Sequence, residues 1–343
     1  MAGLSLSPIG LGIAAAMSAT NVFADVARKK ALENRALIPA TMWCKVATAL
    51  VYAIALTYRV SNVAPVEIRD GGSLFGIDGV HLAPAPTYLI YLLIDVVLVS
   101  LCNLLYFKAL QVSPMSLCVP FLAFTPIFLI PTGYIMLGEL PPAIKLMGVA
   151  LIVAGSVAMH RKLFAEGWTA PFRAIVRERG SRYMLMVAFL FSITNPLDKK
   201  LVQMSDIYTV AFSYGTGMCV FFWLLALARH EPLAGALGAN AKWIGTAGAA
   251  EGVSVLLQFA SYAFVDVVIA VSIKRAGIVL AVLFGWLFFR EREVTDKLIA
   301  TSVMFAGVLI LYLPLTAAQT IVVCAAALAA MGIALYATRH RPA

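Results

Sequence analysis

The fold is decided by residues 112–159, which read VSPMSLCVPFLAFTPIFLIPTGYIMLGELPPAIKLMGVALIVAGSVAM. This stretch contains two long apolar runs, 115–137 and 142–159, on either side of a short turn with Gly138 and Glu139. A span of the hydrocarbon core needs about 20 mainly apolar residues. The stretch therefore predicts two membrane-spanning helices joined by a tight connection.

The same pattern covers the rest of the chain. Eleven apolar runs are present, at residues 8–27, 38–58, 87–107, 115–137, 142–159, 183–198, 207–228, 243–264, 267–289, 297–315 and 318–337. The run at 183–198 is short and contains Pro196, and the turn between Phe264 and Val267 is very tight. Continuous runs of this length exclude membrane strands, whose residues alternate in polarity. The predicted fold class is an all-α, polytopic membrane protein.

The composition agrees with this fold class. The chain has 343 residues, of which 62% are hydrophobic and 13% charged, whereas soluble domains have roughly 45–50% apolar and about 25% charged residues. The formal net charge is +9, but the Lys and Arg residues are scattered between apolar runs. We therefore expect a lipid bilayer as the surrounding partner and no nucleic-acid partner.

The basic residues also predict an orientation. They gather in the connections after the first, fifth, seventh and ninth runs and in the C-terminal tail, which holds Arg339 and Arg341. The positive-inside rule then places the N-terminus outside and the C-terminus inside. The first run has no basic residue before it, unlike a signal peptide, so we interpret it as a retained span. The predicted location is integral and multi-pass in the plasma (inner) membrane.

An internal repeat relates the two halves of the chain. Displaced by 152 residues, Leu104, Glu139, Lys145 and Gly155 fall on Leu256, Glu291, Lys297 and Gly307, and at an offset of 174 Thr20-Asn21 falls on Thr194-Asn195. Each half contains five spans, an odd number, so the second copy enters the membrane from the opposite side. The sequence predicts a ten-helix inverted 5+5 repeat, the architecture of many secondary transporters.

The repeat also predicts the domain boundaries. The first five-helix repeat is expected over 1–160, a basic linker over 161–182, the second repeat over 183–315, and an additional C-terminal helix with a basic tail over 316–343. The prolines at 114, 120, 126 and 131 suggest a bent, gate-like fourth span in the first half.

Several motifs resemble the EamA-type repeat of the drug/metabolite transporter superfamily. The resemblance is carried by Tyr106–Pro114, by Pro120–Pro126, and by Leu137-Gly138-Glu139 with Lys145 and Gly148. The second copy has Phe289-Arg290-Glu291, Lys297 and Gly307. The resemblance implies a protein of ten helices in two inverted halves, which exports or exchanges small metabolites without ATP. The chain departs from the family in its eleventh run, and in a charge pattern that places the N-terminus outside although family members commonly have both termini in the cytoplasm.

Three charged residues lie deep inside apolar runs, where a charge costs about 2.5–3.5 kcal/mol or more. They are Glu251, Lys274 and Arg275. One interpretation is a structural pair of Glu251 with one of the two cations. The other is a cationic cavity wall that binds a phosphate or carboxylate, with Arg275 forked for bidentate contact and Lys274 as a point charge. The Lys-Arg pair is also similar to that of the sugar-phosphate and nucleotide-sugar relatives in the superfamily.

Further polar groups are candidates for the same cavity. Asn21 and Asn195 match across the repeat, and Asn103, Gln258 and Tyr262 lie along the helices before each tight turn. The alternative role for these side chains is interhelical hydrogen bonding. Acidic candidates for a proton carrier are Asp25, Asp95 and Asp198, although the Lys residues beside Asp25 and Asp198 favour an interface role. Glu139 and Glu291 are interpreted as stabilising the N-terminus of the helix that follows each of them.

These residues predict a secondary active transporter that moves a small polar or anionic metabolite by alternating access. The alternatives are a flippase for a lipid-linked or amphipathic substrate, or a non-transporting membrane partner protein with the same fold. An enzyme is not expected, because the four histidines are dispersed and the five cysteines lack ligand spacing. We predict no catalytic residue, no metal and no cofactor; the solute, its direction, the coupling ion and the oligomeric state stay open.

Overall fold

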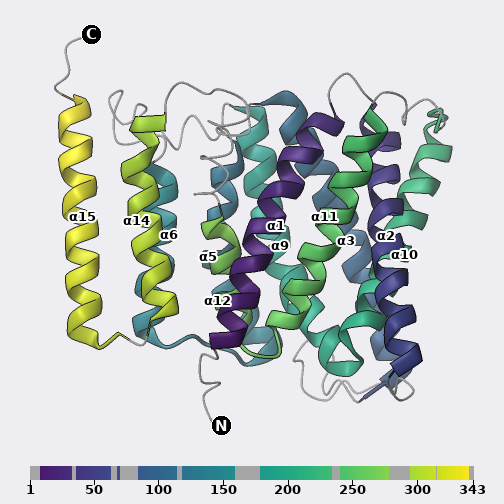
Figure 1. Cartoon of the computed structure of the whole chain (residues 1–343), viewed down its shortest axis with the longest axis horizontal. Coiled ribbons are helices and arrows are strands. Elements are labelled where there is room, and N and C mark those ends of the chain that lie inside the picture. Colours follow the sequence, from purple (N-terminus) through teal and green to yellow (C-terminus); the bar gives the residue numbers. More distant parts are fainter. Residues whose placement is uncertain are drawn as a thin grey trace.

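The computed structural model describes residues 8–32, 36–62, 68–69, 84–113, 118–158, 178–233, 240–277, 294–313 and 315–339. Within these residues every regular element is a helix (Figure 1). The first half contains α1 (Pro8–Ala31), α2 (Leu37–Asn62), α3 (Pro84–Val112), the 3₁₀ helix η2 (Val119–Phe124), α5 (Thr125–Leu137) and α6 (Ala143–Ala158). The second half contains α9 (Arg179–Met204), α10 (Ile207–Ala228), α11 (Ala241–Ser261), α12 (Val267–Ala276) and α14 (Val294–Tyr312), followed by α15 (Ala317–Arg339).

Two of the predicted spans differ from their helices in a way that proline chemistry explains. The run at 183–198 belongs to a longer helix that continues through Pro196 to Met204, because neighbouring helices satisfy the backbone that proline leaves free. In the proline-rich fourth span, the helix geometry changes from 3₁₀ to α between Phe124 and Thr125. Residues 278–289 of the predicted ninth span lie outside the described residues.

The two halves have opposite directions, as the odd number of spans predicts. In Figure 1, α1 begins at the lower face, whereas its counterpart α9 begins at the upper face. The packing pairs obey the same relation. The contact of α1 with α11 is mirrored by that of α9 with α3, and the contact of α1 with α12 is mirrored by that of α9 with α5. The fold is an inverted repeat whose copies pack mainly through each other.

The extra C-terminal helix is peripheral. In Figure 1, α15 lies at one edge of the bundle beside α14, and it packs against α14 and α6 through the small residues Cys324 and Ala327. Among the described residues, the centre of the bundle is therefore formed by the helices that precede α15.

The surface is that of a membrane protein. Large apolar side chains point away from the bundle at positions where a soluble protein would be polar, among them Leu50, Ile54, Leu93, Ile135 and Val322. By length and composition alone, three helices of the described residues qualify as spans, at Leu37–Ser61, Pro84–Val112 and Ile207–Ala228. Helices α1 and α9 carry more charged residues than these three, and α11 packs against both of them.

Candidate functional site

A polar cavity lies between the two halves. Its empty volume is about 670 Å³, and its walls come from α1 and α3 of the first half and from α9, α10, α11 and α12 of the second. Seven of the eight predicted site residues line it, namely Asn21, Asn103, Asn195, Glu251, Gln258, Lys274 and Arg275. The eighth, Tyr262, reaches the same cluster through its hydroxyl. The structure thus brings all eight side chains together.

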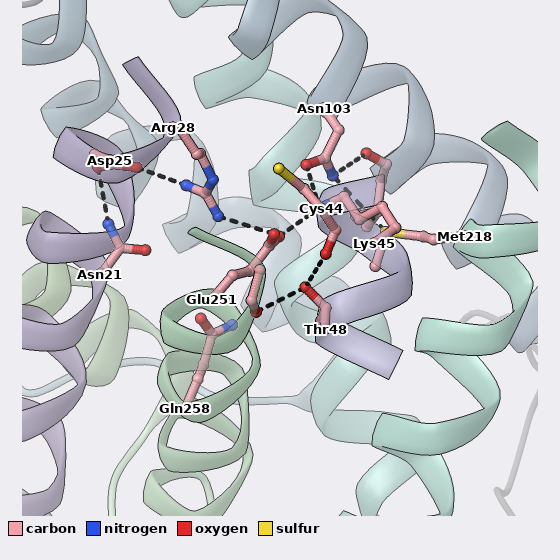
Figure 2. Close-up of polar contacts among 12 residues, drawn as sticks. Asn21, Asp25, Arg28, Cys44, Lys45, Thr48, Asn103, Met218, Glu251 and Gln258 are labelled. Atoms are coloured by element: carbon pink, nitrogen blue, oxygen red, sulfur yellow. Dashed lines mark hydrogen bonds and ion pairs between the residues drawn. The ribbon is translucent and has the colours of Figure 1, made fainter. Parts of the chain in front are cut away.

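Glu251 is the centre of a buried charge network on one side of this cavity. Figure 2 shows it between Arg28 of α1 and Lys45 of α2. Its Oε1 lies 2.5 Å from Nζ of Lys45, and its Oε2 lies 3.2 Å from a guanidinium nitrogen of Arg28. A second guanidinium nitrogen of Arg28 binds Oδ1 of Asp25 at 2.5 Å. The network joins the first two helices of the first half to α11 of the second.

The interpretation that Glu251 pairs with Lys274 or Arg275 is therefore wrong about the partner. The reason is the packing order, because α11 lies against α1 and α2, while α12 lies against α1 and α5. The partners of Glu251 are Arg28 and Lys45, and neither is among the predicted site residues. Lys45 lies inside a predicted span, which is the same signal that identified Glu251. Arg28 is hidden in the sequence because it precedes Lys29 and Lys30 and resembles a loop cation.

The burial of these groups explains why they must be paired. The Lys45 side chain is fully buried, and Arg28 and Glu251 are nearly so. A buried charge is tolerated only with a close partner. Lys45 is satisfied further by Oδ1 of Asn103 at 2.7 Å, and the Arg28 guanidinium lies over the rings of Tyr106 and Phe107. Within this network the charges of Glu251 and Asp25 are matched by Lys45 and Arg28.

A second cluster on the other side of the cavity consists of amides and hydroxyls. Nε2 of Gln258 donates to Oδ1 of Asn195 at 3.0 Å and to the Tyr262 hydroxyl at 2.7 Å. The Tyr262 hydroxyl donates to the same Asn195 oxygen at 3.3 Å. Nζ of Lys274 donates to Oε1 of Gln258 at 2.6 Å. Lys274 is therefore held by a neutral amide, which leaves its charge uncompensated by that contact.

The two repeat-related asparagines have different local contacts. Asn21 donates to Oδ2 of Asp25 at 3.2 Å within α1. Asn195 donates to the carbonyl of Phe191 within α9, while its oxygen accepts from the Gln258 cluster. Asn21 therefore extends the charge network and Asn195 extends the amide cluster.

Arg275 is a cation of the cavity wall that, like Lys274, forms no ion pair with a carboxylate among the described residues. The residue is only 6% exposed, and its guanidinium lies over the Phe191 ring at 5.2 Å from the centroid. Its Nε has no hydrogen-bond partner, and among the described residues no carboxylate lies within ion-pair distance of it. An unpaired buried guanidinium is suited to bind a carboxylate or phosphate.

Glu139 follows the end of α5 and contacts elements of the other half. Its Oε2 accepts from the backbone N–H of Val267 at 3.0 Å, and its Oε1 lies 2.5 Å from Nζ of Lys199. The prediction that Glu139 stabilises the helix that follows it is thus wrong, because the carboxylate caps α12 of the other half. Its repeat counterpart Glu291 lies outside the described residues.

Two inverted five-helix halves around a polar cavity define the class, because this is the architecture of many secondary transporters. The chain belongs to the EamA-like transporter family, whose model matches residues 8–160 and 179–313. No curated protein matches the chain. A solved structure, described only as the crystal structure of a protein, is 14% identical with a TM-score of 0.64, covering 88% of this chain and 96% of that one. At this identity the likeness shows the fold alone.

Proposed function

We propose that the protein is a secondary active transporter that moves a small polar or anionic metabolite across the membrane by alternating access. The observation that carries this proposal is the buried guanidinium of Arg275 in the wall of the central cavity, which has no carboxylate partner among the described residues. Four side chains in and beside the cavity have cationic ends, while Glu251 and Asp25 are already matched by Lys45 and Arg28. An anionic group on the solute would supply the missing partner of Arg275, with Lys274 beside it.

The inverted repeat supports alternating access. The helix contacts of the two copies mirror each other. An arrangement of the halves that opens the cavity to one side of the membrane therefore has an equivalent arrangement that opens it to the other side. Exchanging the two arrangements would expose the same cavity first to one side of the membrane and then to the other. The ion pair of Glu139 with Lys199 and the network around Glu251 each join the first half to the second. We propose that these contacts break and form as the halves move against each other.

The remaining features of the proposal follow from the charge distribution. The partners are the lipid bilayer and a small solute, with no role for nucleic acid. The basic connections favour the plasma (inner) membrane, with the N-terminus outside.

The test begins with the purified protein in detergent, screened by thermal unfolding against amino acids, sugar phosphates, nucleotide sugars and hydrophobic cations. A ligand that binds only the folded state raises the unfolding temperature by mass action. A stabilising compound is then loaded into proteoliposomes, and exchange of its radiolabelled form is measured. We expect exchange of a polar or anionic compound by the wild type and by Lys242→Gln, which removes an exposed cation of α11. We expect its loss in Arg275→Gln.

Two results would contradict the proposal. Stabilisation and exchange of hydrophobic cations alone would contradict the anionic cavity wall. Movement of labelled lipid between leaflets, without exchange of any soluble compound, would replace the transporter by a flippase.

A further inference from the structure

Two aspartates face each other where the halves meet. Asp95 comes from α3 and Asp198 from α9, and these helices are packed together. The carboxyl groups lie within hydrogen-bonding reach of each other. Asp95 is fully buried, and Asp198 is 6% exposed and lines the cavity. The pair therefore extends from the cavity wall into the protein interior.

Both carboxyl groups have oxygens without the donor that a buried carboxylate requires. In the part of the chain that the structure describes, no N–H or O–H group reaches either oxygen of Asp95, or Oδ1 of Asp198. Among the described residues, the titratable groups that act on the pair from the surrounding helices are Tyr52 of α2, Cys102 of α3, Tyr214 of α10, Tyr262 at the end of α11, and Lys274 of α12. Lys274 is the cation in this set, and its ammonium donates to Gln258 rather than to either aspartate.

Two carboxylates that share a buried site cannot both be ionised, because their repulsion adds to the cost of burying each charge. A single proton removes this conflict, since the protonated group becomes the O–H donor that the other group lacks. The arrangement therefore holds one proton between Asp95 and Asp198, and the cavity gives Asp198 a path for exchanging it.

We propose that Asp95 and Asp198 form a proton-binding pair, and that this proton binds together with the anionic solute and crosses the membrane with it. Only the second part of this inference, the movement of the proton together with the solute, rests on the proposed function. Its basis is the position of Lys274, which lines the same cavity as Asp198 and acts on that carboxyl group. When the proton leaves, the Asp198 carboxylate competes with the solute for the Lys274 ammonium. When the proton returns, Lys274 and Arg275 are both available to the anion.

The first experiment concerns the proton alone and requires no ligand. Infrared difference spectra of the protein in lipid are recorded during a pH titration, in the carbonyl-stretch region of protonated carboxyl groups. We expect a band in the wild type that is lost in both Asp95→Asn and Asp198→Asn. The control Asp206→Asn keeps the band, because Asp206 is a helix cap paired with Arg59, and asparagine can still cap. Thermal unfolding of each variant verifies that it is folded.

The second experiment measures the coupling between proton binding and anion binding. It uses inorganic phosphate first, and then any anion that stabilises the protein in the screen above. Binding of one proton with the anion makes the affinity of the wild type rise as the pH falls, by up to about tenfold per pH unit. We expect this dependence to disappear in Asp198→Asn, while the anion still binds.

The outcomes separate the two proposals. A band that is absent from the wild type, or that persists in Asp95→Asn, overturns the proton pair whatever the protein transports. If no titrating band is seen and NaCl, but not KCl, raises the unfolding temperature, the pair is a sodium site and the proton-binding proposal is overturned. A screen without any anionic ligand overturns the proposed function and leaves the infrared result to decide the pair.

Discussion

The backbone N–H of Val267, the first residue of α12, donates to Oε2 of Glu139 at 3.0 Å across the boundary between the two repeats. Lys199 of α9 binds the other oxygen of the same carboxylate and the carbonyl of Val265. One acid therefore ties the end of α5 to α9 and to the turn before α12. Because these elements belong to different halves, this contact must change if the halves move against each other.

Replacing Glu139 separates the two parts of this contact. Glutamine can still accept from Val267 but leaves Lys199 without a carboxylate, whereas alanine also removes the cap, a loss of about 1 kcal/mol. We expect Glu139→Ala to lower the free energy of unfolding more than Glu139→Gln, as measured by thermal unfolding in detergent. Equal stability of the wild type and both variants would show that the contact does not stabilise the fold.

The pairing of Glu251 is tested by a double-mutant cycle. Glu251→Gln leaves Lys45 and Arg28 without their shared carboxylate, and breaking a buried pair costs about 3–5 kcal/mol. Lys45→Met should cost less, because Arg28 still compensates Glu251. The two substitutions should couple by more than about 1 kcal/mol, because the residues are in contact.

Arg275 supplies the control for that cycle. It shares no ion pair with Glu251, so Arg275→Gln and Glu251→Gln should add to within about 0.5 kcal/mol. Restoration of stability or exchange in the Arg275→Gln, Glu251→Gln double variant would show instead that these two residues are the pair.

These residues show how much of the site can be predicted from the sequence. Glu251, Lys274 and Arg275 are identifiable because a charge inside an apolar run is costly. The partner of Glu251 is not identifiable, because α11 and α12 follow each other in the chain while the neighbours of Glu251 are α1 and α2. Packing between distant helices decides ion pairs, and hydropathy does not contain that information.

The overall fold is more predictable, for a physical reason. The hydrocarbon core imposes a length on every helix, so the eleven apolar runs identify the helices, and an odd number of spans per repeat fixes the inversion. The ends of α9 differ from the prediction because Arg179, Arg182 and Lys199 are polar but helical. Their backbone continues the helix where hydropathy alone places a loop.

A pair of glycines sets the distance between α6 and α14. A Cβ on Gly148 would lie 2.7 Å from the carbonyl oxygen of Gly307, and one on Gly307 would lie 2.6 Å from that of Gly148. We expect Gly148→Ala to cost about 1–3 kcal/mol of folding free energy through overpacking. Gly245 in α11 has no atom within 4 Å of such a Cβ, so Gly245→Ala should stabilise by about 0.5–1 kcal/mol. Thermal unfolding of both variants tests this contrast, and equal effects would contradict the close approach.

The start of α9 provides a pH-dependent contact. Glu178 accepts hydrogen bonds from the Ser113 hydroxyl and from the backbone N–H groups of Gly180 and Ser181. Partial burial raises the pKa of Glu178, but these hydrogen bonds outweigh it, and the pKa lies below its ordinary value. The carboxylate therefore stabilises the fold fully above the unfolded pKa of about 4.3, and the contribution is lost as the pH falls through the folded pKa.

Glu178→Gln should accordingly lower the unfolding temperature at pH 7, and the difference from the wild type should shrink on acidification. Ser113→Ala should raise the pKa of Glu178 toward its ordinary value. Unfolding temperatures recorded over this pH range test both statements; a difference between Glu178→Gln and the wild type that is independent of pH would contradict them.

The binding of an anionic solute by Arg275 is tested most directly by isothermal titration, which measures the affinity of the stabilising anion for the wild type and for Arg275→Gln. Loss of a charged hydrogen bond of about 1.5–3 kcal/mol corresponds to a decrease of roughly 10- to 150-fold. We expect this decrease in affinity. We also expect the ligand-free variant to unfold at or above the temperature of the wild type, because the substitution removes a buried charge that forms no ion pair with a described carboxylate. Unchanged affinity in a folded Arg275→Gln protein would contradict this role of Arg275.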